Sequence, residues 1–182
     1  MKKLFFLRHG LSELNLQYLF CGSTDSPLAE IGREEALLAG KQFNKEKVTK
    51  GIVFDAILSS PLIRAKETAE LYVKGAGISE PEITIEPLLT ERDFGSLEKT
   101  RYSKEVSSSL LNDNLPEGVE KWDDVVNRAQ QILDKIEAIE GNVLLVGHGS
   151  IGRAMKKVIN DNYNKDLDWK VHIPNSEITQ LL

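Results

Sequence analysis

The chain has 182 residues, of which 41% are hydrophobic and 28% charged, a balance typical of one globular domain with its own core, and we treat residues 1–182 as that domain. The net charge of -5 and the pI near 5.3 argue against a nucleic-acid-binding protein, which normally carries a basic surface. No stretch approaches the ~20 apolar residues of a membrane span, and the single cysteine, Cys21, cannot form an intramolecular disulfide, so we expect a cytoplasmic protein that contacts no membrane.

Apolar runs and segments with helical spacing alternate along the chain. Strands are predicted at 3–8, 55–59, 83–85 and 142–147. Helices are predicted at 31–44, 61–74, 119–139 and 151–159. Such alternation indicates an α/β fold, and we expect a three-layer α/β/α sandwich with a mostly parallel central sheet.

Two predicted helix starts and two loops carry further information. Ser60 offers an N-cap hydroxyl and Pro61 suits the first helical position, which would place Arg64 about one turn into its helix. The residues 147–150 (Gly-His-Gly-Ser) close one strand and open a helix, whose N–H groups form a natural anion site. Surface loops are predicted at 75–82 and 107–117, the second as a candidate lid.

Three predicted strands end in residues that can do chemistry. His9 follows the first strand, Ser59 and Ser60 lead from the second to Arg64, and His148 follows a later one. Taken alone, each residue has an ordinary interpretation, such as a surface histidine or a solvated arginine. Ligands of open α/β sheets bind beyond the carboxyl ends of the strands, so we expect these residues to converge.

Four sequence blocks occur in order between Lys3 and about Asn175. They are Arg8-His9-Gly10, Arg64 within its Ser-Ser-Pro-Leu segment, Glu91, and His148-Gly149. Together they resemble the histidine phosphatase superfamily, in its phosphoglycerate mutase-like branch. The segment 20–25 and Asp93-Phe94-Gly95 are loosely similar to α-ribazole phosphatases. Leu19, Cys21 and Leu97-Glu98-Lys99 depart from the family pattern, and these departures concern the pocket for the leaving group.

The resemblance implies a division of catalytic roles. His9 would be the nucleophile that forms a phosphohistidine. Arg8, Arg64 and His148 would hold the phosphoryl oxygens and stabilise charge in the transition state. Glu91 would protonate the leaving oxygen and then activate water to hydrolyse the intermediate.

The resemblance also suggests three further contacts with the phosphate. Asn15 and Ser12 would add neutral donors to the group of cations that holds it. Gly149, which lacks a side chain, would let the ligand approach the backbone closely. The expected partner is therefore a small phosphorylated metabolite, bound by a monomer or a homodimer.

A metal site is the competing use of the histidines. The chain has three, His9, His148 and His172, and none stands at the spacing of metal ligands. Arg8 and Arg64 would moreover repel a divalent cation. We therefore expect metal-independent catalysis without a cofactor, and interpret His172 as a structural or exposed residue.

Hydrolysis of a phosphate monoester is the first of several functions compatible with these residues. A cofactor-dependent phosphoglycerate mutase is the second. Such mutases carry a long insertion between the acid and the second histidine, whereas 57 positions separate Glu91 from His148 here, which favours hydrolysis. A phosphohistidine-protein phosphatase and a phosphate-binding regulatory module are further alternatives, although such a module should have lost His9 or Glu91.

Overall fold

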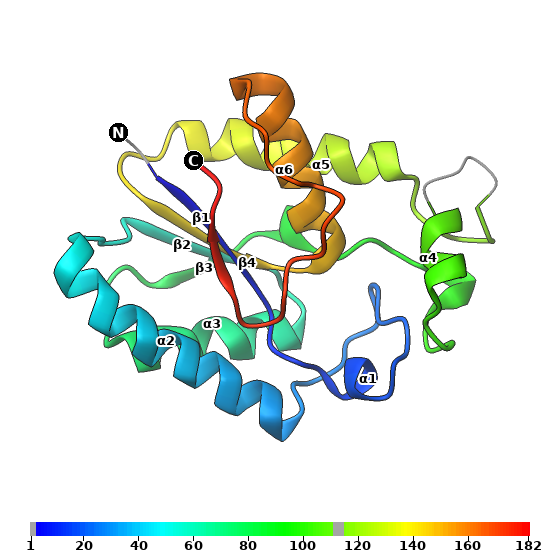
Figure 1. Ribbon diagram of the computed structural model, residues 1–182, viewed down its shortest axis with the longest axis horizontal. Helices are drawn as coiled ribbons and strands as arrows, with labels where there is room; N and C mark the ends of the chain where they lie inside the picture. The colour runs from blue at the N-terminus through cyan, green and yellow to red at the C-terminus, as the bar shows by residue number, and fades with distance from the viewer. Residues whose placement is uncertain (1–2, 111–114) are drawn as a thin grey trace.

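A five-stranded sheet with the order β3-β2-β4-β1-β5 forms the centre of the computed structural model (Figure 1), which describes residues 3–110 and 115–182. The strands are β1 (Leu4–Arg8), β2 (Ala56–Ser59), β3 (Ile83–Ile85), β4 (Val143–Gly147) and β5 (Ile178–Gln180). The first four run parallel, and β5 pairs antiparallel with β1. The four predicted strands and the mostly parallel sheet are confirmed, whereas the edge strand β5 was not predicted.

Helices cover both faces of this sheet, with α2 and α3 below it and α5 and α6 above it in Figure 1. The helices are α1 (Glu13–Leu16), α2 (Glu30–Lys50), α3 (Ile63–Ala76), α4 (Lys104–Ser109), α5 (Trp122–Glu137) and α6 (Gly149–Tyr163), with two 3₁₀ turns, η1 (Pro87–Leu89) and η2 (Gly95–Leu97). Successive β1 side chains point to opposite faces. Leu4 and Phe6 therefore pack against α5 and α6, and Phe5 and Leu7 against α2 and α3. The predicted three-layer sandwich is confirmed.

The register of the central strands brings their carboxyl ends to one level. Arg8 at the end of β1 pairs with Gly147 of β4, and Ser59 of β2 pairs with Val146. The next residues, His9, Ser60 and His148, therefore emerge side by side at one edge of the sheet.

The start of α3 differs from the prediction. The helix begins at Ile63 with Leu62 at the N-cap position, so Ser60 is not its cap and Arg64 is the second helical residue. The Asp25 carboxylate satisfies the Ile63 N–H at 2.7 Å instead, and this contact is 38 positions away in sequence. A local cap motif could not reveal a capping group supplied by a distant loop.

Other boundaries shift by a few residues. Helix α5 is shorter than the predicted 119–139, because Val119 forms an isolated bridge with Phe94. Helix α6 starts at Gly149, earlier than predicted, and α4 covers part of the segment predicted as a loop at 107–117. Residues 111–114 of that segment lie outside the described residues.

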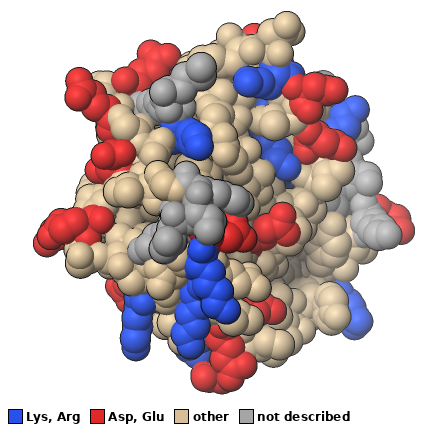
Figure 2. All heavy atoms as spheres, turned by 60° about the vertical axis from the view of Figure 1, so that its left-hand side comes forward, with Lys and Arg blue, Asp and Glu red and all other residues tan. Residues whose placement is uncertain are grey.

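Charge is mixed on the molecular surface. Acidic and basic side chains are interspersed across the face shown in Figure 2. Within residues 3–110 and 115–182, no helix combines the length and the apolar character needed to traverse a bilayer.

Candidate active site

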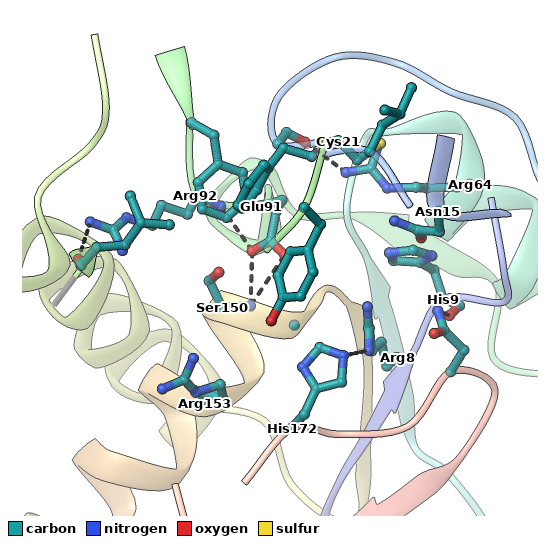
Figure 3. A pocket seen from close by; sticks show the side chains of 18 of the residues that line it. Arg8, His9, Asn15, Cys21, Arg64, Glu91, Arg92, Ser150, Arg153 and His172 are labelled. Carbon is teal, nitrogen blue, oxygen red and sulfur yellow. Dashed lines mark hydrogen bonds between the residues drawn. The ribbon is translucent and has the colours of Figure 1, made fainter. Parts of the chain in front are cut away.

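A cavity of about 690 Å³ lies at the carboxyl edge of the sheet (Figure 3). Its walls come from β1, the segment 11–22, α3, the segment 91–110, the starts of α5 and α6, and the segment 170–175. Six of the predicted site residues line it: Arg8, His9, Asn15, Arg64, Glu91 and Gly149. Ser12 and His148 are not among the lining residues, but each contacts one: His148 packs against His9, and Ser12 accepts a hydrogen bond from the Asn15 N–H.

His9 is held in a defined orientation at the base of this cavity. Only 2% of the residue is exposed. Its Nδ1 lies 2.6 Å from the Gly10 carbonyl oxygen, which can only accept, so Nδ1 carries the hydrogen and Nε2 keeps its lone pair. The main chain of His9 donates to the Gly147 oxygen at 2.9 Å and accepts from the Asn175 amide at 2.7 Å.

The surroundings of His9 favour its neutral form. Burial, followed by the positive charges of Arg64 and Arg8, holds the pKa of His9 well below its ordinary value near 6.5. At neutral pH the imidazole is therefore uncharged, and Nε2 is available as a nucleophile.

Two guanidinium groups flank this imidazole. Arg64 is fully buried, and its terminal nitrogens donate to the oxygens of Gly22 at 2.7 Å and Thr24 at 2.9 Å. Arg8 donates through Nη1 to the Ile173 oxygen at 2.8 Å. Burial lowers the pKa of Arg8 to about 10, with Glu91 raising it and Arg64 lowering it, so Arg8 remains charged at neutral pH.

The second imidazole packs against the first. The rings of His9 and His148 have centroids 5.0 Å apart, and His148 is fully buried. The Ser60 hydroxyl accepts from the Leu62 N–H at 3.3 Å and lies 2.7 Å from His148 Nε2. When the hydroxyl donates its hydrogen to Nε2, the imidazole hydrogen lies on Nδ1. Burial, followed by the charge of Arg64, keeps the pKa of His148 well below its ordinary value.

Several of the residues around His9 have a buried polar atom without a partner. Three of them are nitrogens on its cationic and imidazole neighbours: Arg8 Nε, Arg64 Nε and His148 Nδ1. Buried donors are normally hydrogen-bonded, because an unpaired one loses its hydration without compensation. Among the described residues these three have no acceptor, which is the expected state of a site shaped for an anion.

The loop that seats Arg64 is itself held by Glu98. The Glu98 carboxylate accepts from the N–H groups of Ser23 at 2.7 Å and Thr24 at 2.8 Å, from both of their hydroxyls, and from the Phe94 N–H at 3.2 Å. Burial alone would raise the pKa of Glu98, but the hydrogen bonds from Thr24 and Ser23 together lower it below the ordinary value. Glu98 therefore fixes, as a charged acceptor, the carbonyls that bind Arg64.

Glu91 is placed at the junction of the cavity and α6. Its carboxylate accepts from the Arg92 N–H at 2.9 Å and from the Ser150 N–H at 3.0 Å, and Figure 3 shows it across the cavity from His9. The Arg128 side chain supports this segment, since it donates to the oxygens of Leu88 and Thr90 at 2.7 and 2.8 Å.

Gly149 lies among three side chains that line the cavity. A Cβ atom at this position would stand 3.3 Å from His172 Cε1, 3.6 Å from Glu91 Oε2 and 3.7 Å from Arg8 Cζ. Only the contact with His172 would be tight, because 3.6 and 3.7 Å are ordinary contact distances, and the approach of a ligand to the Gly149 backbone stays a prediction.

The two neutral donors have different surroundings. Asn15 lines the cavity, and its buried Oδ1 has no partner among the described residues. The Ser12 hydroxyl accepts from the Asn15 N–H at 3.2 Å and thereby caps α1. Ser12 therefore orients Asn15 and does not face the cavity.

His172 was predicted to be either structural or exposed. It is exposed, and it also lines the cavity. Its Nε2 accepts from Arg8 Nη1. Loss of hydration against the wall, followed by the charges of Arg8 and Arg153, lowers the pKa of His172 to about 4. Sequence reasoning missed this contact, and missed Asn175, because isolated polar residues in a loop carry no pattern.

No group of three or more histidine, cysteine, aspartate or glutamate side chains in the described part of the chain is arranged to hold a metal ion. The charged groups that surround His9 are guanidiniums, which bind oxyanions through pairs of parallel hydrogen bonds.

Comparison with known proteins defines the class. Residues 4–182 match the histidine phosphatase superfamily (branch 1), and the chain belongs to this family. It is 34% identical over 174 residues to a 2,3-bisphosphoglycerate-dependent phosphoglycerate mutase of Methylobacterium sp. (strain 4-46), covering 87% of this chain and 81% of the mutase. It is 28% identical to a Hydrogenobacter thermophilus protein provisionally named phosphoserine phosphatase 2, covering 100% of this chain and 89% of the relative.

Solved structures support the same fold. A mycobacterial glucosyl-3-phosphoglycerate phosphatase aligns with a TM-score of 0.81 at 23% identity, covering 99% of this chain and 92% of that structure. An Escherichia coli K-12 protein provisionally assigned as an α-ribazole-5′-phosphate phosphatase aligns with a TM-score of 0.75 at 23% identity, covering 98% and 89%. The family predicted from the four sequence blocks is therefore confirmed, and its relatives include both mutases and phosphatases.

Proposed function

We propose that this protein is a phosphatase that hydrolyses small phosphate monoesters through a phosphohistidine on His9, with Glu91 as the proton donor. The observation that carries the proposal is the set of unpartnered buried nitrogens on Arg8, Arg64 and His148 around the neutral His9. These nitrogens can donate to the oxygens of one phosphoryl group and stabilise the charge that develops there during transfer. Asn15 can add a neutral donor at the cavity wall.

The first step transfers the phosphoryl group to the enzyme. The lone pair of His9 Nε2 attacks phosphorus, and the bond between phosphorus and the ester oxygen breaks. The departing oxygen takes a proton from the Glu91 carboxyl group and leaves as an alcohol. The products of this step are the free alcohol, phosphorylated His9 and the Glu91 carboxylate.

The second step regenerates the enzyme. The Glu91 carboxylate accepts a proton from water while the water oxygen attacks the phosphorus of the phosphohistidine. The phosphorus–nitrogen bond breaks, the electron pair returns to Nε2, and inorganic phosphate leaves. Glu91 is protonated again and His9 is neutral, so the cycle closes.

The size of the cavity supports a small substrate over a phosphorylated protein. Its volume of about 690 Å³ falls within the range of small-molecule sites, ~300–1,000 Å³. A phosphohistidine on a protein surface would need a shallower site.

Phosphoglycerate mutase activity is the second candidate, because a relative of that name is 34% identical over most of this chain. The short distance of 57 positions between Glu91 and His148 leaves little chain to enclose a bisphosphorylated intermediate. Entry of water, and therefore hydrolysis, is favoured. Incubation with 3-phosphoglycerate and 2,3-bisphosphoglycerate, followed by ³¹P NMR, separates release of phosphate from interconversion of phosphoglycerates.

The decisive experiment removes the nucleophile. His9→Asn keeps an amide that can donate to the Gly10 oxygen but supplies no counterpart of Nε2, and His9→Ala removes both groups. We expect both variants to lose at least about a thousandfold in kcat on p-nitrophenyl phosphate, as expected when a nucleophile is removed. In the wild type, quenched turnover should trap an acid-labile, alkali-stable phosphoryl label that both variants lack.

Because His9 is only 2% exposed, the circular dichroism spectrum and the Tm of each variant must first match those of the wild type. A well-folded His9→Asn protein that retained near-normal turnover would remove His9 from its assigned role.

A further inference from the structure

The cavity carries more positive charge than one phosphoryl group requires. Five cationic residues line it, Arg8, Arg64, Arg92, Arg153 and Lys170, against one carboxylate, that of Glu91. The chain as a whole has a net charge of -5, so this concentration of cations is local. Such a concentration is typical of a site that attracts an anion.

Three of the five cations have evident uses. Arg8 and Arg64 stand beside His9. Arg92 is buried, and its guanidinium donates to the oxygens of Glu120 at 2.7 Å and Leu110 at 3.0 Å, which ties together two segments of the wall. Arg153 and Lys170 remain without such a use.

Arg153 is anchored but retains free donors. Its Nε donates to the Trp169 oxygen at 3.0 Å, and its guanidinium carbon lies 5.5 Å from the centroid of the Trp122 ring. Among the described residues, no carboxylate forms an ion pair with it. In Figure 3, Arg153 lies on the far side of Ser150 from His9, so its terminal nitrogens belong to the other end of the cavity.

Aromatic rings hold both remaining cations in place. The Trp122 and Trp169 rings stack with centroids 5.9 Å apart, and Lys170 Nζ lies 5.7 Å from the Trp169 ring centroid. Trp122 lines the cavity, and its buried indole nitrogen has no acceptor among the described residues. A second group of donors, independent of the first, therefore surrounds this end.

We propose that this end of the cavity, formed by Arg153, Lys170 and Trp122, binds a second anionic group on the alcohol portion of the substrate. The substrate class is then a phosphate monoester whose far end carries a carboxylate or another phosphate. A guanidinium matches either group through two parallel hydrogen bonds. The inference rests on the proposed function and adds the feature that selects among monoesters, with Arg153 as the principal contact.

The test uses esters that differ only at the far end. Propyl phosphate, 3-(phosphonooxy)propanoate and propane-1,3-diol bisphosphate present a methyl, a carboxylate and a phosphate on the same three-carbon chain, and five-carbon analogues extend the reach. We expect kcat/KM for phosphate release to be at least about tenfold higher for an anionic ester than for its neutral counterpart, the size expected for a hydrogen bond to a charged group. The carboxylate and bisphosphate arms identify which anion is preferred.

Variants then assign the preference to Arg153. Arg153→Ala should reduce the ratio of kcat/KM between anionic and neutral esters by about ten- to a hundredfold. Arg153→Lys, which keeps the charge but not the paired donors, should reduce the ratio less. Lys157→Ala, on the same helix but outside the cavity lining, should leave the ratio unchanged.

The outcomes separate this inference from the proposed function. Equal turnover of all esters by the wild type, or an unchanged ratio in a folded Arg153→Ala protein, would overturn the second anion site while leaving the phosphatase proposal intact. Absence of phosphate release from every ester, and from p-nitrophenyl phosphate, would overturn both.

Discussion

The two ends of the cavity differ in how the fold holds them. At the phosphoryl end, His9 and His148 follow central strands, Arg64 begins a buried helix, and none of the three is more than 2% exposed. At the far end, Arg153 is partly exposed on α6 and Lys170 is exposed in the segment after it. The proposed phosphoryl transfer needs fixed geometry, which buried strand ends provide. The far end can change with the substrate, because loop and surface residues can be replaced without disturbing the core.

Glu91 lies between these ends. Apart from the residues proposed to contact the phosphoryl group, we expect its substitution to have the largest effect on activity. Glu91→Gln should lower kcat for alkyl phosphates by about 10²–10⁴-fold, because a poor leaving group needs a proton from the enzyme. Aryl phosphates with acidic leaving groups should lose much less. Steady-state kinetics on propyl and p-nitrophenyl phosphate measure the difference, and equal losses on both esters would argue against Glu91 as the acid.

Glu98 tests whether the phosphoryl end depends on support from the loop around it. Glu98→Gln replaces the charged acceptor of the Ser23 and Thr24 donors, so the carbonyls that seat Arg64 should loosen. We expect about a tenfold rise in the inhibition constant of inorganic phosphate, comparable with the loss of one hydrogen bond to a charged group. Glu98→Asp should recover part of the loss.

Asp93→Asn is the matched control for this experiment. Asp93 lies in the same segment and accepts from the Gly95 N–H at 2.7 Å, but it makes no hydrogen bond to the residues that seat Arg64. If Asp93→Asn and Glu98→Gln weaken phosphate binding equally, the effect is a general loss of order and Glu98 has no positioning role.

Acid should destabilise the buried end of the cavity selectively. The pKa values of His9 and His148 are depressed in the folded protein, so both imidazoles take up protons only on unfolding. Their contribution to stability is complete above pH 6.5 and is lost as the pH falls below that value, by about 1.4 kcal/mol per pH unit for each imidazole. Urea unfolding at pH 7.5 and 5.5 should therefore give free energies that differ by about 3 kcal/mol from these two imidazoles. His148→Gln should remove about half of this difference, and an unchanged difference would show that His148 is not titrating on unfolding.

The sheet and the phosphoryl end could largely be predicted from the sequence. Continuous apolar runs identify buried parallel strands, and residues that follow parallel strands meet at one edge. His9, Arg64 and His148 could therefore be assigned to the same edge of the sheet from the sequence alone. The cap of α3 was predicted wrongly, because Asp25 reaches it from a distant loop.

The far end and the supporting contacts could not be predicted in this way. Arg153 resembles any partly exposed helical arginine until its neighbours Trp122 and Trp169 are known. β5 is only three residues long and pairs with a strand at the other end of the chain, so it has too little pattern to be recognised. Contacts of this kind are set by tertiary structure and leave no local signal.

The contact between Asn175 and His9 has a consequence for the order of events during synthesis. The Asn175 amide binds the His9 oxygen although it enters the chain 166 positions later, and His172 joins Arg8 after a similar interval. A nascent chain on the ribosome therefore contains His9 early, but it lacks the side chains that contact His9 and Arg8 until residue 175 has been translated. The proposed active site should therefore be complete only late in synthesis, when β5 pairs with β1.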